Sequence, residues 1–455
     1  MSSVSGSTAV VKRKIGLITA ISIVIANMIG TGIFTTSGIM TVYLPGPIWV
    51  LGCWLLGGLL AMSGALCYAE LATRMPEEGG EYIYLKTLYH PLLSFLTGWT
   101  SFLVGFSAPI AASALGAVNY IFMGMKENIP DFNPAYTQSY IKISAAAIIL
   151  VFTMVHYLGV RVGSVVQNVL TGFKIVVVAG LVLLGLFSGG DWSNLCIPTN
   201  QGVKSLAFGT AMMLVMFSYS GWNASAYIAG EIKNPNRYLP RSLILGTALV
   251  ILIYLILNLF ILLAVPYTNL TGQITVFESA LKFVLGDWIG KVISIAIGIA
   301  LFSSLSAFIL LGPRIYFAMS RDRLFFSFAS KIHPRFEVPG RSILIQGFVA
   351  VVLLLIGTFE QMLIYLGFAL SIFPWLAVLG VFIARRRQIN STHAVKVWGY
   401  PVTPLLFLTG SLSLMIIAWI NRPVESTAAI LTIAGGIPVY YLWVRYIKKE
   451  LADSK

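Results

Sequence analysis

Charged residues are scarce in this sequence. Of its 455 residues only 10% are charged, 58% are hydrophobic, and the mean hydropathy is +0.87. Because soluble globular domains carry about 25% charged residues, this composition excludes an ordinary soluble protein. The sequence predicts a polytopic membrane protein instead.

Cysteine and histidine are also few, with three and four residues. Cys53 and Cys67 are expected about 21 Å apart on one helix, too far for a disulfide bond, and Cys196 falls in a predicted outer loop. No histidine has a cysteine or acid at metal-ligand or nucleophile-base spacing. We therefore expect no metal site, no cofactor and no enzymatic activity.

Long apolar runs fill the rest of the chain. About twelve runs of roughly 20 residues recur, and each is long enough to cross the hydrocarbon core of a bilayer. They are continuously apolar, whereas the strands of a membrane barrel alternate, so an all-α fold is predicted. The predicted spans are 15–40, 46–71, 92–124, 139–158, 163–187, 204–230, 241–265, 291–319, 341–357, 361–384, 400–421 and 427–446.

The net charge of +14 arises from basic residues that are concentrated in alternate predicted loops, and it does not indicate a nucleic-acid partner. Basic residues gather in alternate loops, as at Lys12 to Lys14 and Arg385 to Arg387. The other loops hold only Lys126, Lys142, Lys204, Lys282, Lys291 and Arg422. By the positive-inside rule both termini are cytoplasmic. The chain is thus predicted to be a multi-pass protein of the inner (plasma) membrane.

Two glycines interrupt the first span, in Ile29-Gly30-Thr31-Gly32-Ile33-Phe34. An unpaired amide or carbonyl costs several kcal/mol in hydrocarbon, so non-helical backbone at this depth survives only beside a protein-lined, wet or ligand-filled cavity. Taken alone, the stretch fits a simple kink equally well. The sixth span carries a matching interruption at Phe217 to Ser225. Matched breaks in spans one and six are expected from an inverted repeat of five plus five helices and indicate a transporter site.

Lys174 is the one charged residue expected deep inside a span. It ends a stripe formed by Ser164, Gln167 and Thr171 on the fifth span. An ionisable group at that depth is costly and marks a functional site by default. Serines of the eighth span, Ser303 among them, lie at a depth where Lys174 can donate to them.

Two further patterns predict packing. Glu70 and Arg74 are one helical turn apart, which favours an ion pair at the cytoplasmic end of span two over a catalytic pair. Small residues follow one face of the third span and allow close helix packing. They are Gly98, Ser101, Gly105, Ala108, Ala112 and Gly116.

The chain resembles the amino acid-polyamine-organocation superfamily, and it is most similar to the prokaryotic neutral amino-acid permeases and L-amino-acid-transporter-like exchangers. The matching stretches run in order through spans one to eight: Gly30 to Phe34, Tyr68 to Leu71, Phe217 to Asn223, Glu231 to Pro235 with Pro240, and Pro313-Arg314 with Ala318 to Asp322.

The resemblance implies the LeuT-like fold and alternating access. It places one inverted repeat at 15–187 (spans one to five) and the other at 204–384 (spans six to ten). Two additional spans occupy 400–446, and the cytoplasmic tails are 1–14 and 447–455.

The physical properties of the two breaks agree with an amino-acid site. Amides at the start of a half-helix suit a carboxylate, and carbonyls released in the second break suit an ammonium. The predicted substrate-binding residues are Ile29, Gly30, Thr31, Gly32, Phe217, Ser218, Tyr219, Ser220, Trp222 and Asn223. The resemblance adds coupling and gating residues, namely Lys174 in the place of a sodium ion, Ser303, Ser304 and the outer gate Phe217.

These roles imply sodium independence, while proton symport and exchange of one amino acid for another both stay open. No acid falls in mid-span, so a cationic side chain lacks a buried counter-charge and neutral L-amino acids are predicted as substrates. The alternatives are a permease for a related amine or polyamine, and a non-transporting sensor. Sensors usually have long soluble tails, whereas the tails predicted here are short. The sequence predicts lipid and the substrate as binding partners and does not indicate a protein partner.

Overall fold

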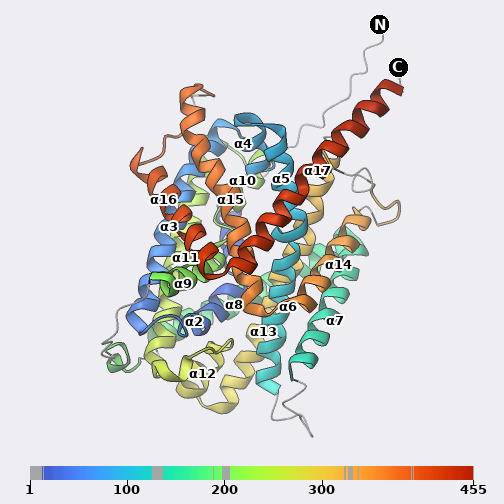
Figure 1. Ribbon diagram of the computed structural model, residues 1–455. Coiled ribbons are helices and arrows are strands. Elements are labelled where there is room, and N and C mark those ends of the chain that lie inside the picture. Colours follow the sequence, from blue (N-terminus) through green and yellow to red (C-terminus); the bar gives the residue numbers. More distant parts are fainter. Residues whose placement is uncertain are drawn as a thin grey trace.

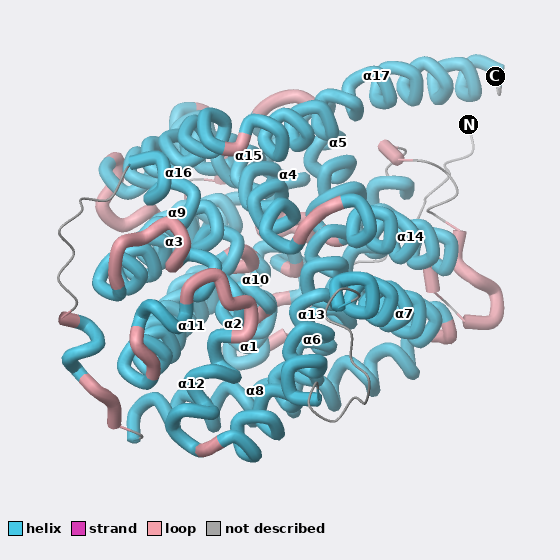
Figure 2. Tube along the Cα trace, turned by 60° about the horizontal axis from the view of Figure 1, so that its bottom comes forward, coloured by secondary structure: helices cyan, strands magenta, loops and turns pink. Residues whose placement is uncertain are grey.

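The computed structural model describes residues 13, 15–125, 137–187, 189–196, 205–321, 324–325, 331–336, 338–390, 392 and 394–453. Most of the predicted tail 1–14 and Asp322, from the motif after span eight, lie outside them. Helices make up nearly all of the described structure (Figure 2). The all-α prediction is confirmed.

The helices agree with the predicted spans. Among the described residues, ten helical segments are long and apolar enough to cross a membrane, and the shorter apolar helices α9 (Ser205–Tyr219) and α14 (Gly340–Ile356) occupy predicted spans six and nine. Span one consists of α1 (Leu17–Met28) and α2 (Thr31–Met40), and span two is α3 (Pro47–Arg74). Span three runs through α5 (Pro91–Thr100), the π-helix η1 (Ser101–Gly105) and α6 (Ser107–Met125).

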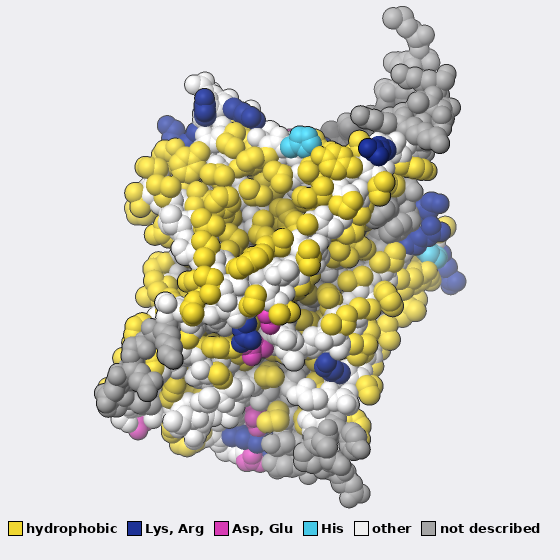
Figure 3. Space-filling model, viewed as in Figure 1, with side chains coloured by type: hydrophobic (Ala, Val, Ile, Leu, Met, Phe, Trp, Pro, Cys, Tyr) yellow, Lys and Arg dark blue, Asp and Glu magenta, His cyan; other side chains and the backbone are white. Residues whose placement is uncertain are grey.

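The remaining spans are single helices. They are α7 (Thr137–Tyr157), α8 (Val160–Phe187), α11 (Pro235–Ala264), α13 (Asp287–Arg321), α15 (Phe359–Arg386), α16 (Val402–Asn421) and α17 (Pro423–Asp453). Their surface is apolar, as lipid contact requires: yellow side chains cover most of the face in Figure 3, and dark-blue basic groups lie mainly at its upper and right margins and in its lower part.

Two short helices were not predicted. α4 (Glu81–Leu88) follows span two, and α12 (Val276–Leu285) follows span seven. They lie at opposite ends of the molecule (Figure 1). Neither is long enough to cross a bilayer. Each instead buries apolar residues against the spans, such as Leu85 from α4 and Phe277 from α12.

The centre of the molecule is the broken first span. α1 and α2 lie between α11 on one side and α6 and α13 on the other (Figure 2). Every residue of α2 is buried. At the end of span one that is predicted to be cytoplasmic, Ile15 pairs with the loop after the second break: its amide donates to Glu231 O (2.9 Å), and its carbonyl accepts from the Lys233 amide (2.9 Å). The backbone thus joins the start of span one to the end of span six.

Candidate functional site

The first break lies where it was predicted. α1 ends at Met28 and α2 begins at Thr31, so Ile29 and Gly30 are non-helical. The first amides of a helix have no partner within it and carry the positive end of its dipole. The start of α2 therefore presents unpaired donors inside the protein.

The second break is also confirmed. α9 ends at Tyr219, and a turn leads to the short helix α10 (Ala224–Tyr227) and the 3-10 helix η5 (Ala229–Glu231). Gly221 in that turn has φ of +96°, a conformation that side-chain-bearing residues rarely adopt. The glycine is thus required for the chain to leave the helix at this point.

The two breaks touch each other. A Cβ built on Gly32 would lie 2.4 Å from Ser218 Oγ, which leaves room only for hydrogen. Thr36 Oγ1 and Ser218 Oγ are hydrogen-bonded at 2.9 Å. Tyr254 of α11, which sequence reasoning missed, places its hydroxyl within hydrogen-bonding distance of Met28 O and Ser218 O. The Tyr254 hydroxyl therefore lies within hydrogen-bonding distance of one carbonyl oxygen from each break.

Lys174 completes the end of α1. Its ammonium donates to Ile29 O (2.9 Å) and Ala26 O (3.1 Å) and lies 3.4 Å from Ser304 Oγ. The side chain is buried. The expected link between spans one, five and eight through Ser304 is confirmed. Ser303, by contrast, makes no hydrogen bond through its hydroxyl in the described structure.

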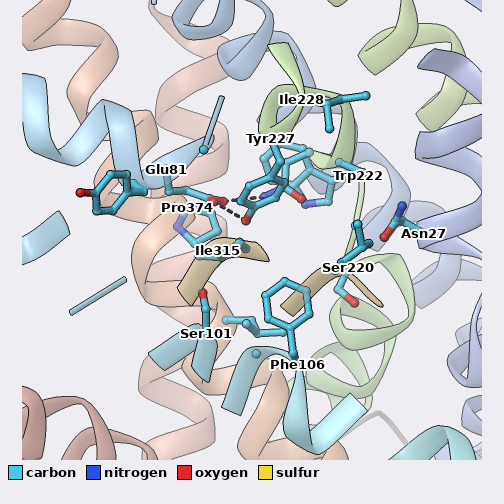
Figure 4. Close-up of a pocket in the computed structure, with 18 of the residues that line it drawn as sticks. Asn27, Glu81, Ser101, Phe106, Ser220, Trp222, Tyr227, Ile228, Ile315 and Pro374 are labelled. Carbon is cyan, nitrogen blue, oxygen red and sulfur yellow. Dashed lines mark hydrogen bonds between the residues drawn. The ribbon is translucent and has the colours of Figure 1, made fainter. Parts of the chain in front are cut away.

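A cavity of approximately 780 Å³ opens beside the breaks. Eight of the predicted substrate-binding residues line it: Gly30, Thr31, Gly32, Phe217, Ser218, Ser220, Trp222 and Asn223. Ser101, Phe106 and Ile315 form other parts of the wall (Figure 4). The volume is typical of a small-molecule site. Ser101 also belongs to the predicted small-residue face, so part of that face is a cavity wall.

Two predicted substrate-binding residues do not line the cavity. The Ile29 carbonyl instead accepts the bond from Lys174. Tyr219 is fully buried, and its hydroxyl donates to Trp54 O at 2.9 Å on α3. Both residues hold the breaks in place and are not positioned to touch a ligand in the cavity.

The cavity reaches the side that the sequence predicts to be cytoplasmic. Its lining includes Glu77, Lys86 and Glu231 from loops assigned to that side. Towards the other side Phe34 packs edge-on against Phe277 and Tyr120, with ring centres 5.4 and 6.4 Å apart. Beyond this aromatic layer, Tyr43, Glu360 and Arg422 are joined by hydrogen bonds. The described structure is thus open on one side and closed on the other.

An acid that sequence reasoning left in a loop also lines the cavity. Glu81, the first residue of α4, is 2% exposed. It accepts hydrogen bonds from Tyr68 (2.7 Å) and Asn223 (2.5 Å) and from the Tyr227 hydroxyl. Figure 4 shows its carboxylate turned towards Tyr227. Burial raises the pKa of the Glu81 carboxyl, although these bonds oppose the shift.

Glu70 has the structural role that was expected. It forms an ion pair with Arg74 (2.8 Å) and a second with Arg385 of α15 (2.5 Å). It also accepts a bond from the Val397 amide (2.8 Å). In the part of the chain that the structure describes, no group of three histidine, cysteine or acidic side chains is arranged to hold a metal ion.

Known proteins resemble the whole chain. A protein-family model described as amino acid permease matches residues 15–443. The chain is 30% identical over 436 residues to the serine/threonine exchanger SteT of Bacillus subtilis (strain 168), covering 94% of this chain and 96% of that protein. It is 30% identical to the human b(0,+)-type amino acid transporter 1 (96% and 89% covered) and 26% identical to the mouse Asc-type amino acid transporter 1 (96% and 82% covered).

Proposed function

The chain belongs to the amino acid permease family and transports amino acids, and we propose that it carries neutral L-amino acids by sodium-independent alternating access. The observation that carries this proposal is the shared cavity of the two breaks. Donors at the start of α2 and acceptors in the turn after α9 line one space. Groups of opposite polarity in one cavity suit the carboxylate and the ammonium of an amino acid.

Lys174 supports sodium independence. Its ammonium already donates hydrogen bonds to the carbonyl oxygens of Ala26 and Ile29 at the end of α1. Carbonyls of this kind are typical ligands of a sodium ion at a broken helix. With a fixed cation in that place, a sodium ion would face repulsion and lose two ligands.

Neutral substrates remain the better proposal although an acid lines the cavity. Glu81 accepts bonds from three neutral donors, which already engage its oxygens. The proposal therefore rests on these neutral partners, which already orient the carboxylate towards Tyr68, Asn223 and Tyr227. Among coupling modes we favour exchange, because one relative is named as an exchanger. A proton-coupled symporter is the competing mode.

Alternating access is supported by the closed side of the structure. The aromatic layer around Phe34 and the Tyr43–Glu360–Arg422 cluster belong to the side predicted to face outward, and none of Phe34, Tyr43, Glu360 and Arg422 lines the cavity. Their opening would let the same cavity face outward. We propose that both termini are cytoplasmic and that the protein lies in the inner (plasma) membrane.

Purified protein in proteoliposomes tests the proposal. Uptake of labelled neutral amino acids is measured into vesicles that are empty or preloaded with unlabelled amino acid, with and without sodium and a proton gradient. We expect uptake that depends on preloading and is unaffected by sodium. Stimulation of empty vesicles by the proton gradient would favour symport, and substrate binding without flux under every condition would contradict transport.

A further inference from the structure

A buried carboxylate, that of Glu81, lines the cavity beside the segment that follows the second break. Glu81 comes from α4, whereas its donors Asn223 and Tyr227 come from the segment after the break and Tyr68 comes from α3. An ionised carboxylate can only accept hydrogen bonds. Each N–H or O–H group that hydrogen-bonds to the Glu81 carboxylate must therefore direct its hydrogen towards Glu81.

This requirement fixes the side-chain amide of Asn223. Its Nδ2 lies 2.5 Å from Glu81 Oε1, so its Oδ1 lies on the opposite side of the amide group. Within the described structure Oδ1 accepts no hydrogen bond, and it is not one of the enclosed polar atoms. Asn223 lines the cavity. The free carbonyl oxygen is thus accessible to a molecule that occupies the cavity.

Tyr227 is oriented in the same way. Its hydroxyl hydrogen is used by Glu81 Oε2, and the Asn223 amide is 3.5 Å from its oxygen. The hydroxyl therefore offers only acceptor capacity to other groups. Nearby wall residues such as Phe106 and Ile315 are apolar (Figure 4). This part of the cavity combines an apolar surface with one acceptor, Asn223 Oδ1, that has no donor in the described structure.

We propose that Glu81 is a positioning residue for substrate selection: it turns Asn223 and Tyr227 so that the cavity accepts a hydrogen bond from the substrate side chain. The substrate class is neutral amino acids with a side-chain hydroxyl. This inference rests on the proposed transport of neutral amino acids and narrows it. A hydroxyl satisfies the free acceptor without the cost of burying a further charge.

Threonine and valine test the proposal because they have nearly the same shape and differ in one hydroxyl. Exchange in proteoliposomes is measured for each, and the ratio of their kcat/KM values is the readout. We expect wild type to favour threonine by about tenfold, since an acceptor left unpaired in a site discriminates strongly. O-methyl-L-serine, compared with L-serine, shows whether the donor hydrogen is what matters.

The variants separate orientation from simple contact. Glu81→Gln supplies an amide donor, so Asn223 can turn its oxygen away from the cavity, and the ratio should fall about tenfold while valine exchange persists. Asn223→Ala removes the acceptor without altering the acid and should lower the ratio equally. Asp191→Asn, the same change of acid to amide on an exposed outer loop, should leave the ratio unchanged.

Several results would overturn the inference. One is a wild-type protein that exchanges amino acids without favouring threonine over valine. Another is a ratio that survives in Asn223→Ala, which decides the matter even if Glu81→Gln fails to fold. A wild-type protein that exchanges no amino acid would instead overturn the proposed function together with the inference.

Discussion

Replacement of Gly32 by alanine should separate the two breaks. The added Cβ would lie 2.4 Å from Ser218 Oγ and 2.6 Å from Ser218 Cα, whereas ordinary van der Waals contact begins at 3.4 Å. The backbones must therefore move apart by about 1 Å in a close-packed interior. Overpacking of this kind costs about 1–3 kcal/mol. We expect a lower melting temperature in detergent and at least a tenfold loss of exchange in proteoliposomes, because the cavity walls shift.

The control is Gly180→Ala on α8, where an added Cβ meets no atom within 4 Å. This variant should melt and exchange as wild type does. Ser218→Gly removes the hydroxyl but leaves the Cα in place, so in a double-mutant cycle it should recover only part of the loss caused by Gly32→Ala. Wild-type melting and exchange in Gly32→Ala would show that the breaks do not touch as described.

Three other predictions concern Lys174, the first break and Glu81. Lys174→Ala should reduce exchange more than it reduces folding, because two carbonyls at the end of α1 lose their donor; a wild-type exchange rate with unchanged pH dependence would refute the coupling role. Gly30→Leu should abolish substrate binding in a radioligand assay by covering the amides at the start of α2, and undiminished affinity would leave the first break a mere kink. Acidification on the cavity side should lower the threonine-to-valine ratio, because a protonated Glu81 can donate. Loss of solvent on burial raises the pKa of Glu81, although the hydrogen bonds from Tyr227, Tyr68 and Asn223 lower it, so the change should begin above the usual pH range of a glutamate; a similar pH response in Glu81→Gln would contradict this.

Span positions could be predicted from the sequence because the bilayer imposes a minimum length on each apolar run. The breaks could be predicted because glycine and polar residues are conspicuous in such runs. α12 was not predicted because its ten residues are too few to span a bilayer. Its apolar face is explained only by its packing against α13 in the folded protein. The length rule that identifies spans gives no information on helices that lie across their ends.

The two breaks could be predicted, whereas side chains such as Tyr254 and Glu81 were missed. Tyr254 sits in a continuous apolar run, so nothing local distinguishes a phenol that bonds two breaks from one that packs. Glu81 was assigned to a loop, and only the folding of α4 beneath the second break brings it to Asn223. The pair Gly79-Gly80 directly before it marked a sharp turn there, which was the available signal that the acid could point inward.

The prediction of neutral substrates relied on the absence of acidic residues, and this absence holds only within the predicted spans. No acid was found in mid-span, yet Glu81 reaches the cavity from outside the spans. Among the described residues, its hydrogen-bond donors are three neutral groups and no basic one. Counting charges along a helix therefore misses a charge that a neighbouring segment inserts from the membrane surface.

The pairing of Ile15 with the loop after α10 has a consequence for mutagenesis. Its two hydrogen bonds use main-chain atoms only, so any residue except proline can make them at positions 15 and 233. A library that varies side chains would score these positions as tolerant although their main-chain atoms join the start of span one to the loop after α10. Proline at either position, or an ester in place of the amide, would remove one of these main-chain hydrogen bonds and leave every side chain of the cavity wall unchanged.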